Sequence, residues 1–431
     1  MPQLLQRTPQ YQLPALAEHL RYGTTQARSS GAFTPCAGRR HAALSTVLGL
    51  LFAACCMAAS AQIAFQAQPV LVTGPSPFSL ATGDFDGDGK LDLAVAASGN
   101  GDVYVYTGSG DGVFHYSSYR ATGPAPVSIV AAHLRHVPQF DLIAGLDSPA
   151  NPPTSTYGLV GTLLGNANGT FQSESTHAIG SVDYVSHSVY SVAVDDFDQD
   201  GYADIVATNA QDNTVSVLFG HGDGTFEIAA NYQTGISPRA VVIGDFAGLG
   251  NADIAVADFA DNTVSILLNN GNGSFGSRVS YAAGTGPNSI AVGDFNGDGI
   301  ADLAVTNFGS DSTRVLIGDG HGHFAWNGIV IFSPTPTYVA TGDFDGDGIL
   351  DLAIADYSGG YVYVERGVGD GTFQFIQAFS AGAGPNSIVI GNFNEDGKFD
   401  LAVADRATNT VTVLLNVSIP TDRVFSSGFE P

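Results

Sequence analysis

Cysteine is absent from most of this sequence. The three cysteines, Cys36, Cys55 and Cys56, all lie within the first 61 residues. Disulfide bonds therefore cannot hold the rest of the chain together. Its stability must come from a buried apolar core, to which bound metal ions could add. Apolar residues make up 44% of the sequence, which is enough for a large core.

Basic residues are also scarce. The sequence has 15 Lys and Arg against 41 Asp and Glu, and its formal net charge is −26. Residues 1–61 hold five arginines and one glutamate, so the remainder carries about −30. A chain this acidic is unsuited to the phosphates of nucleic acid, so we expect no nucleic-acid partner. Bound cations would offset much of its self-repulsion.

Common catalytic signatures are missing too. There is no H-E-x-x-H, no G-x-S-x-G, no nucleotide-binding glycine loop and no cysteine nucleophile after residue 61. Aspartate pairs could imitate glycosidase carboxylates, but metal ligation explains them better. We therefore expect a protein that is not an enzyme. No apolar run after residue 61 is long enough to span a bilayer, so we expect no membrane span in the mature chain.

The N-terminal residues 1–61 resemble an export leader. Arg39 and Arg40 precede an apolar stretch at 42–58, and Ala59-Ser60-Ala61 forms a cleavage signal before Gln62. We expect a secreted protein, extracellular or periplasmic. A lipoprotein anchor at Cys55 is one alternative, although Phe52 fits that motif poorly, and a retained membrane anchor is another.

The feature present in abundance is a nine-residue acidic turn followed by an apolar run. Copies start at Asp84, Asp196, Asp245, Asp294, Asp343 and Asn392, and an eroded copy starts at His133. The steps are 49 residues, except for one of 63 after the eroded copy. A period near 50 with about four strand-like segments indicates a β-propeller. The sequence predicts an all-β, seven-bladed propeller of four-stranded blades.

One repeat shows the expected blade. We expect strands at 288–295, 302–307, 313–318 and 325–332, the first two buried on both faces. The last repeat lacks a fourth strand, whereas residues 64–79 resemble a fourth strand and linker. We therefore expect Phe65 to Val72 to close the ring as the outer strand of the last blade. The predicted propeller spans 62–418, and a C-terminal tail spans 419–431.

The turns "DFDGDGKLDLAV" and the "GNGSFG" segment at 271–276 resemble the FG-GAP (VCBS) repeat of the integrin α-chain head propeller. The resemblance covers roughly residues 64–416. It implies a propeller with calcium in its acidic turns and ligands on the opposite face. The family includes adhesion heads, lectins and enzyme side-domains, so its implication for function is broad.

Carboxylates at alternate positions of a tight turn point to one centre and suit a hard cation, with Ca²⁺ favoured over Mg²⁺. An EF-hand is excluded, because Val95 stands where it needs glutamate. Each expected site combines four side chains with the backbone carbonyl of the residue two positions before the last aspartate. The expected sets are Asp84, Asp86, Asp88, Lys90 (carbonyl) and Asp92; Asp196, Asp198, Asp200, Tyr202 (carbonyl) and Asp204; Asp294, Asn296, Asp298, Ile300 (carbonyl) and Asp302; Asp343, Asp345, Asp347, Ile349 (carbonyl) and Asp351; and Asn392, Asn394, Asp396, Lys398 (carbonyl) and Asp400.

Two copies have lost ligands. In the fourth repeat Ala247 and Leu249 replace ligands, and in the second repeat only Asp141 is kept. The set that starts at Asn392 has two neutral ligands and should bind more weakly. We therefore expect four or five Ca²⁺ ions. We expect these ions to stabilise the fold rather than to take part in ligand binding.

The partner is expected on the face opposite the acidic turns. Two insertions near repeats 2 and 3, "LDSPANPPTSTYG" and "SESTHAIGSVDYVSHS", lie on that face. Four pairs spaced by 49 residues lie on that face too: Asp258 and Phe259, Asn307 and Phe308, Asp356 and Tyr357, Asp405 and Arg406. A ring beside a polar group could bind a sugar, because the ring stacks on it and the polar group forms hydrogen bonds. The insertions could instead reflect drift, and the rings could pack between blades.

Together these features predict a monomeric, calcium-binding adhesion or binding module for an extracellular protein or glycan. One alternative is a lectin with pockets between blades. A less favoured alternative is a polysaccharide hydrolase or lyase.

Overall fold

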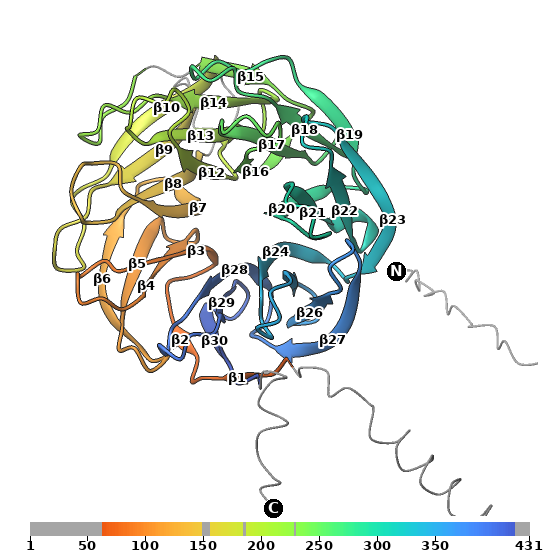
Figure 1. Ribbon diagram of the computed structural model, residues 1–431. Coiled ribbons are helices and arrows are strands. Elements are labelled where there is room, and N and C mark those ends of the chain that lie inside the picture. The colour runs from red at the N-terminus through yellow and green to blue at the C-terminus, as the bar shows by residue number, and fades with distance from the viewer. Residues whose placement is uncertain (1–62, 149–155, 184–186, 228–229, 419–431) are drawn as a thin grey trace, which may run out of the picture. The chain divides into compact units, whose positions relative to one another are not determined.

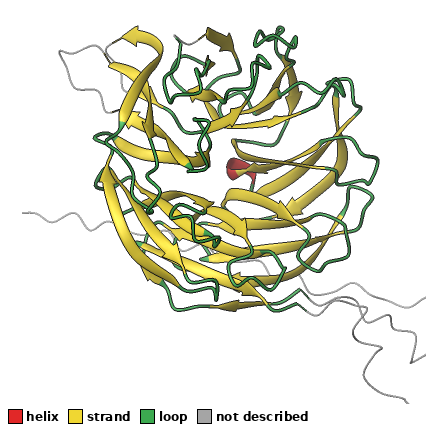
Figure 2. Cartoon of the chain, turned by 60° about the vertical axis from the view of Figure 1, so that its left-hand side comes forward, coloured by secondary structure: helices red, strands yellow, loops and turns green. Residues whose placement is uncertain are grey.

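The computed structural model describes residues 63–148, 156–183, 187–227 and 230–418. Within these ranges the chain forms seven antiparallel β-sheets arranged in a ring (Figure 1). The one helix among the described residues is the short 3₁₀ turn η1 (Phe308–Ser310), visible in Figure 2. No helix in these ranges is long and apolar enough to cross a membrane. The predicted all-β, seven-bladed propeller is confirmed.

Five blades are regular four-stranded meanders, ordered from the innermost to the outermost strand. They are blade 1, β3 (Pro77–Gly83), β4 (Asp92–Ala97), β5 (Asp102–Gly108), β6 (Phe114–Ala121); blade 3, β12 (Val192–Asp195), β13 (Asp204–Asn209), β14 (Thr214–Leu218), β15 (Ala230–Gln233); blade 4, β16 (Pro238–Gly244), β17 (Asp253–Asp258), β18 (Thr263–Leu267), β19 (Val279–Ala282); blade 5, β20 (Pro287–Gly293), β21 (Asp302–Asn307), β22 (Ser312–Gly318), β23 (Phe324–Phe332); and blade 6, β24 (Pro336–Gly342), β25 (Asp351–Asp356), β26 (Tyr361–Gly367), β27 (Phe373–Ser380).

Blade 2 carries an extra strand. It consists of β7 (Ala125–Ala132), β8 (Asp141–Ser148), β9 (Thr156–Leu163) and β10 (Ser175–Asp183), with the two-residue β11 (His187–Ser188) also paired to β8. The longer step in the repeat therefore adds local structure to one blade and leaves the propeller with seven blades.

Blade 7 joins the two ends of the propeller. Its strands β28 (Pro385–Gly391), β29 (Asp400–Asp405) and β30 (Thr410–Asn416) are completed by β1 (Phe65–Ala67) and β2 (Leu71–Val72), both antiparallel to β30. The predicted closing strand is present, but it is interrupted around Pro69, a residue that cannot donate a strand hydrogen bond. This pairing covers the outer edge of β30, which would otherwise be free.

The core lies between neighbouring blades. The second strand of each regular blade is buried along its whole length, as in β4 and β21. The first phenylalanine of an acidic turn also packs edge to face against the Gly-x-Phe ring of the next blade. Phe85 and Phe171 have ring centroids 5.5 Å apart, and Phe393 and Phe114 lie 5.3 Å apart across the closure. Burying one such ring contributes about 1.5–3 kcal/mol. The acidic turn and the Gly-x-Phe turn repeat together because their rings bury each other.

Serine side chains connect the innermost strands around the ring. Each hydroxyl oxygen accepts a backbone N–H from the next blade at 3.1–3.3 Å, in four links: Ser79 with Ile129, Ser128 with Val192, Ser191 with Val241, and Ser289 with Val339. At the closure, Asn386 donates to the carbonyl of Phe78. These bonds satisfy backbone groups that would otherwise face the centre unpaired.

Candidate functional site

The acidic turn of blade 1 folds around the carboxylate of Asp84. That group accepts the backbone N–H of Gly87, Asp88 and Gly89 at 2.7–3.1 Å. Gly87 and Gly89 have φ of 81° and 87°, a left-handed conformation that glycine adopts at low cost. The turn therefore wraps its N–H groups around the first aspartate and leaves other carboxylate oxygens outside.

Three turns bring predicted ligands together. One oxygen of each member lies within 4.8 Å of the others in three groups: Asp84, Asp86 and Asp92; Asp196, Asp198 and Asp204; and Asp343, Asp345 and Asp347. The predicted ligands Asp88, Asp200 and Asp351 do not join their groups at this distance. In blades 5 and 7 neutral Asn296, Asn392 and Asn394 supply part of the set.

The last aspartate of the turn has a structural role that the sequence analysis did not assign. The Asp92 carboxylate is fully buried and accepts the N–H of Phe85 and of Gly108, both at 2.8 Å. It thereby joins the acidic turn to the end of the third strand. The same two bonds occur at Asp204, Asp253, Asp302, Asp351 and Asp400.

Burial raises the pKa of these aspartates, because a charged carboxyl loses its hydration. The pKa rises to about 6 for Asp92, Asp204 and Asp302, and to about 7 for Asp351. A nearby cation would oppose this effect by stabilising the charged form.

The residues of these turns fit a calcium ion. In blades 1 and 3 the grouped carboxylates form no ion pair with a described residue, and their oxygens match the oxygen ligands that Ca²⁺ takes. In blade 7 the side-chain oxygen of Asn392 is buried and has no hydrogen-bond partner among the described residues. Asn392 occupies the first ligand position of its turn, so an unsatisfied oxygen lies where a ligand was predicted.

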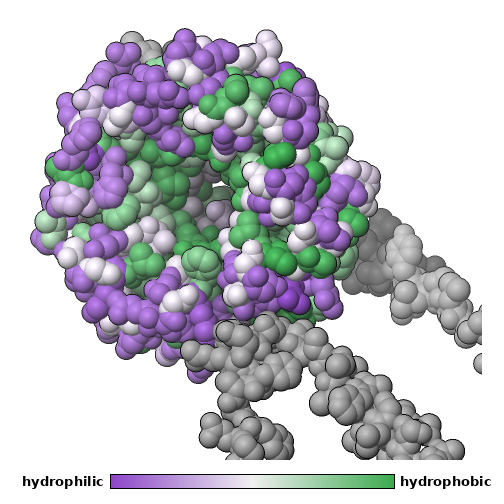
Figure 3. All heavy atoms as spheres, in the orientation of Figure 1, coloured by the Kyte–Doolittle hydropathy of each residue, from purple (hydrophilic) through white to green (hydrophobic). Residues whose placement is uncertain are grey.

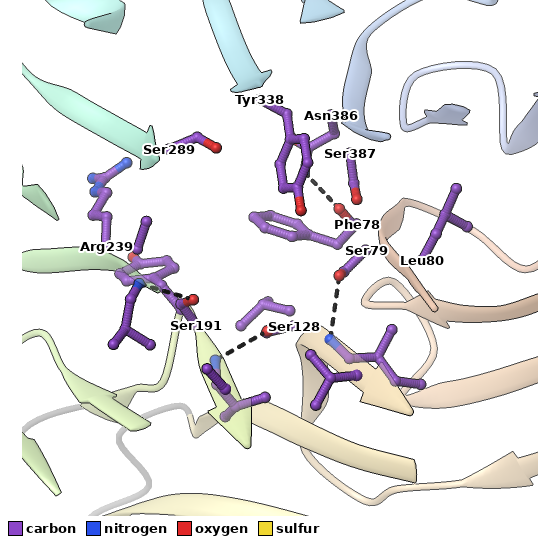
Figure 4. Close-up of a pocket in the computed structure, with 18 of the residues that line it drawn as sticks. Phe78, Ser79, Leu80, Ser128, Ser191, Arg239, Ser289, Tyr338, Asn386 and Ser387 are labelled. Carbon is purple, nitrogen blue, oxygen red and sulfur yellow. Dashed lines mark hydrogen bonds between the residues drawn. The ribbon is translucent and has the colours of Figure 1, made fainter. Parts of the chain in front are cut away.

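A second site lies in the middle of the ring. A pocket of about 920 Å³ is lined by the innermost strands of all seven blades, and its wall is largely apolar (Figures 3 and 4). Tyr338 and Arg239 extend toward it from β24 and β16 (Figure 4). Burial raises the pKa of the Tyr338 phenol. The pocket volume is typical of sites for small ligands.

One end of this pocket is rich in rings. We call it the aromatic mouth and define it as Phe78, Tyr190, Phe259, Phe308 and Tyr357 together with Arg239 and Arg406. Phe78 lies at the start of β3, whereas the acidic turn follows its end at Gly83. Phe259 follows the end of β17, which is antiparallel to β16. The aromatic mouth and the acidic turns therefore lie at opposite ends of the inner strands.

The four predicted ring and polar pairs are only partly brought to the pocket. The pocket is lined by the second member of each pair: Phe259, Phe308, Tyr357 and Arg406. Their polar members, Asp258, Asn307, Asp356 and Asp405, are buried in their own blades. Asp258, for example, accepts hydrogen bonds from Gly235, Ser265 and Thr263. The polar groups hold loops in place, and the rings do not form pockets between blades with them.

Phe78, Tyr190 and Arg239 were missed by the sequence analysis, although a signal for them exists. They occupy the same position of the repeat in blades 1, 3 and 4, and the other blades have Val127, Asn288, Thr337 and Asn386 there. Residues at that position of an innermost strand face the pocket. A search for positions that vary between equivalent blades would have found them.

Comparisons with known proteins agree with the geometry. An FG-GAP-like repeat model matches residues 196–256, 245–305, 294–354 and 343–403, and an FG-GAP repeat model matches 76–107. Together these matches cover more than half of the chain. The chain belongs to the FG-GAP repeat family. A search of curated proteins found no match to its sequence.

Solved structures resemble this FG-GAP protein in fold. BBS1N in complex with ARL6DN is 14% identical with a TM-score of 0.59, and the match covers 82% of this chain and 97% of that one. Virginiamycin B lyase from Staphylococcus aureus is 13% identical with a TM-score of 0.55, covering 81% and 99%. A functionally unknown protein from Desulfotomaculum acetoxidans is 13% identical with a TM-score of 0.54, covering 75% and 92%. At these identities the likeness concerns the fold.

In two FG-GAP turns of this chain an arginine contacts residues at the ligand positions. In blade 2, Arg135 stands at the second ligand position and forms an ion pair with Asp141, the retained aspartate. In blade 6, Arg366 extends from β26 to Asp345 at 2.7 Å and Asp347 at 2.6 Å. The sequence analysis missed both contacts.

The blade 4 turn lacks a carboxylate group of this kind. Asp245 accepts the N–H of Leu249 and Gly250, and Asp253 accepts those of Phe246, Ala247 and Asn269. Both aspartates therefore serve the turn itself, in line with the expectation that this repeat has lost its ligands.

The two predicted insertions are partly outside the described residues. Residues 149–155 of the first and 184–186 of the second are not described, so the proposed role of these loops in binding stays a prediction. The predicted leader at 1–61, Gln62 at the predicted start of the propeller and the tail at 419–431 also lie outside the described residues.

Proposed function

We propose that this FG-GAP propeller is an exported, monomeric binding module that carries Ca²⁺ in its acidic turns and holds an extracellular glycan or protein at its aromatic mouth. The observation that carries the proposal is the separation of two chemically different ends. Grouped carboxylates lie at one end of the inner strands, and an aromatic pocket free of carboxylates lies at the other.

The carboxylate groups would hold calcium for stability. Asp84, Asp86 and Asp92 would bind one ion in blade 1, and the matching residues would do so in blade 3. A bound ion supplies the positive charge that opposes repulsion between these carboxylates. Because the last aspartate also joins two loops of the blade, binding in the turn would stabilise the blade as a whole.

The aromatic mouth would hold the partner. Rings from several blades converge there on a rigid frame, and such sites suit binding by stacking and burial. We propose binding without turnover, because metal ligation and loop bonding account for the aspartates of the described residues.

Melting with and without calcium tests the first half of this proposal. Ca²⁺ that binds the folded turns alone stabilises the protein by about 2.7 kcal/mol per site at a hundred times its Kd. We expect the melting temperature to be clearly higher in millimolar Ca²⁺ than in EDTA. Identical melting curves would contradict calcium binding.

A glycan array, run with calcium, tests the second half. Binding of a glycan without its cleavage is the expected result. Release of shortened oligosaccharides would contradict the proposal that the protein is not an enzyme. Failure to bind any glycan would favour a protein as the partner.

A further inference from the structure

The central pocket has the opposite charge character to the molecule as a whole. The chain has a formal net charge of −26, yet no Asp or Glu side chain is among the described residues that line the pocket. Two of the seven described arginines, Arg239 and Arg406, do line it. An anion would therefore meet less repulsion here than elsewhere on the surface.

These two arginines are unlike the others in their bonding. Neither guanidinium donates a hydrogen bond or forms an ion pair with any residue in the described ranges, and Nε of Arg239 is buried without a partner, as is Nε of Arg314. The remaining described arginines each donate to a carboxylate, hydroxyl or carbonyl oxygen: Arg120, Arg135, Arg278, Arg314 and Arg366. Buried polar atoms are nearly always paired, so the unpaired donors point to a missing acceptor.

Aromatic rings hold both guanidinium groups in place. The guanidinium carbon of Arg239 lies 3.8 Å from the ring centroid of Phe259 and 5.0 Å from that of Tyr190. That of Arg406 lies 4.9 Å from the ring centroid of Phe78. Stacking on a ring engages the face of a guanidinium and leaves the N–H groups at its edge free to donate.

We propose that the aromatic mouth binds a carboxylate-bearing oligosaccharide, with Arg239 and Arg406 donating to its acid groups and the rings stacking against its sugar faces. This inference rests on the proposed function and names the ligand class of that same site. Guanidinium groups pair well with carboxylates because two N–H donors can meet two oxygens.

The neighbouring aspartates do not oppose such a ligand directly. Asp258 and Asp405 precede Phe259 and Arg406 in the chain, but both carboxyls are buried and accept hydrogen bonds from their own blades. Asp356 accepts hydrogen bonds from Thr335 and Gly359 in the same way. Their charges lie behind the mouth.

The inner strands favour a sugar over an extended peptide. Peptides often bind by adding a strand to an exposed sheet edge. Here serine hydroxyls from the preceding blade already accept N–H groups on four inner strands, for example Ile129 and Val192. An extended peptide would have to replace these bonds, whereas a sugar needs only the rings and the guanidinium groups.

The test compares three probes in the presence of calcium by titration calorimetry. They are an oligogalacturonate, a neutral galacto-oligosaccharide of the same length and an oligoglutamate peptide. We expect the oligogalacturonate to bind most tightly and its affinity to fall with added salt. Arg239→Gln and Arg406→Gln should each weaken binding about tenfold to a hundredfold, and the double variant should lose it.

Arg278→Gln is the matched control, because Arg278 donates to Ser265 and Ser280 away from the pocket. It should bind like the unaltered protein, and all variants should keep the parent melting temperature. Equal binding of the neutral sugar, or binding that survives the double variant, would overturn the inference and leave the proposed binding function intact. Preference for oligoglutamate would overturn the assignment to a sugar. Silence toward all three probes would overturn the inference as well, while calcium-dependent melting and the broader array would still judge the proposed function.

Discussion

In blade 1 the turn between the two innermost strands places oxygens of Asp84, Asp86 and Asp92 together, whereas the matching turn of blade 2 keeps only Asp141. Blade 2 supplies its own cation instead. Nη2 of Arg135 lies 2.5 Å from Asp141, and the same group donates to the carbonyl of Gly165.

The difference separates two roles of the last aspartate. Asp141 still accepts the N–H of Leu134 and of Gly165, as Asp92 does for its own turn. The loop bonds are thus kept where the other ligands are lost. What changes is the source of positive charge, which is a side chain of the turn in blade 2 and would be a bound ion in blade 1.

Blade 6 lies between these two cases. Its turn has every predicted ligand, and Asp343, Asp345 and Asp347 are grouped. Arg366 nevertheless pairs with two of them. At the same position of the repeat, blades 4 and 7 have Leu268 and Leu415. A complete motif in blade 6 therefore coexists with a competing cation.

The largest effect should come from removing the cation of blade 2. Arg135→Ala would leave the fully buried Asp141 without its partner. Breaking a buried ion pair on one side costs about 3–5 kcal/mol, because an unpaired charge stays buried. Urea unfolding with calcium present would measure the loss.

Arg120→Ala is the control for that experiment, since Arg120 bonds a backbone carbonyl and no carboxylate. A loss for Arg135→Ala no greater than for this control would show that the guanidinium does not replace a bound ion.

A smaller effect is expected from removing the cation of blade 6. Arg366→Leu copies the residue of blades 4 and 7 and would free Asp345 and Asp347. We expect one more Ca²⁺ per chain in calorimetry, or tighter binding of one ion. In calcium the variant should be more stable than the parent, by up to about 2.7 kcal/mol in the free energy of unfolding at a hundred times Kd, and should melt at a higher temperature. In EDTA it should melt at a lower temperature than the parent, because the carboxylates repel one another. Unchanged calcium stoichiometry and affinity would contradict competition by Arg366.

Much of the fold could be predicted because seven copies repeat one signal. The expected strands at 302–307 and 325–332 match β21 (Asp302–Asn307) and β23 (Phe324–Phe332) to within one residue. The fixed step of the repeat sets the position of each strand, and the resemblance of 64–79 to a later linker predicted the closure of the ring.

The site was harder to predict because its decisive contacts join residues without a shared motif. Arg366 lies 21 residues from Asp345 and on another strand, so the pattern of the turn does not include it. The polar and ring members of each predicted pair are neighbours in sequence, but alternate side chains point in different directions. That is why Phe259 faces the pocket while Asp258 is buried in its blade.

The smallest effect concerns Asp258, which lies beside the aromatic mouth. Blade 4 has this aspartate where blade 5 has Asn307. Burial raises its pKa to about 6 from 3.8, so the folded protein holds this proton more tightly than the unfolded chain. Its contribution to stability therefore falls as the pH rises from 4 to 6. Asp258→Asn removes that dependence and keeps an acceptor for Gly235, as Asn307 does for Gly284 in blade 5.

Relative to the parent, Asp258→Asn should gain stability between pH 4 and 6, by on the order of 1 kcal/mol. Asn307→Asp makes the reverse change in blade 5 and should lose stability over the same range. Melting curves of both variants at each pH, with calcium held constant, would measure the two slopes. If both differences from the parent stayed flat with pH, the buried carboxyl would not be the titrating group, and the charge behind the aromatic mouth would have to be assigned to another residue.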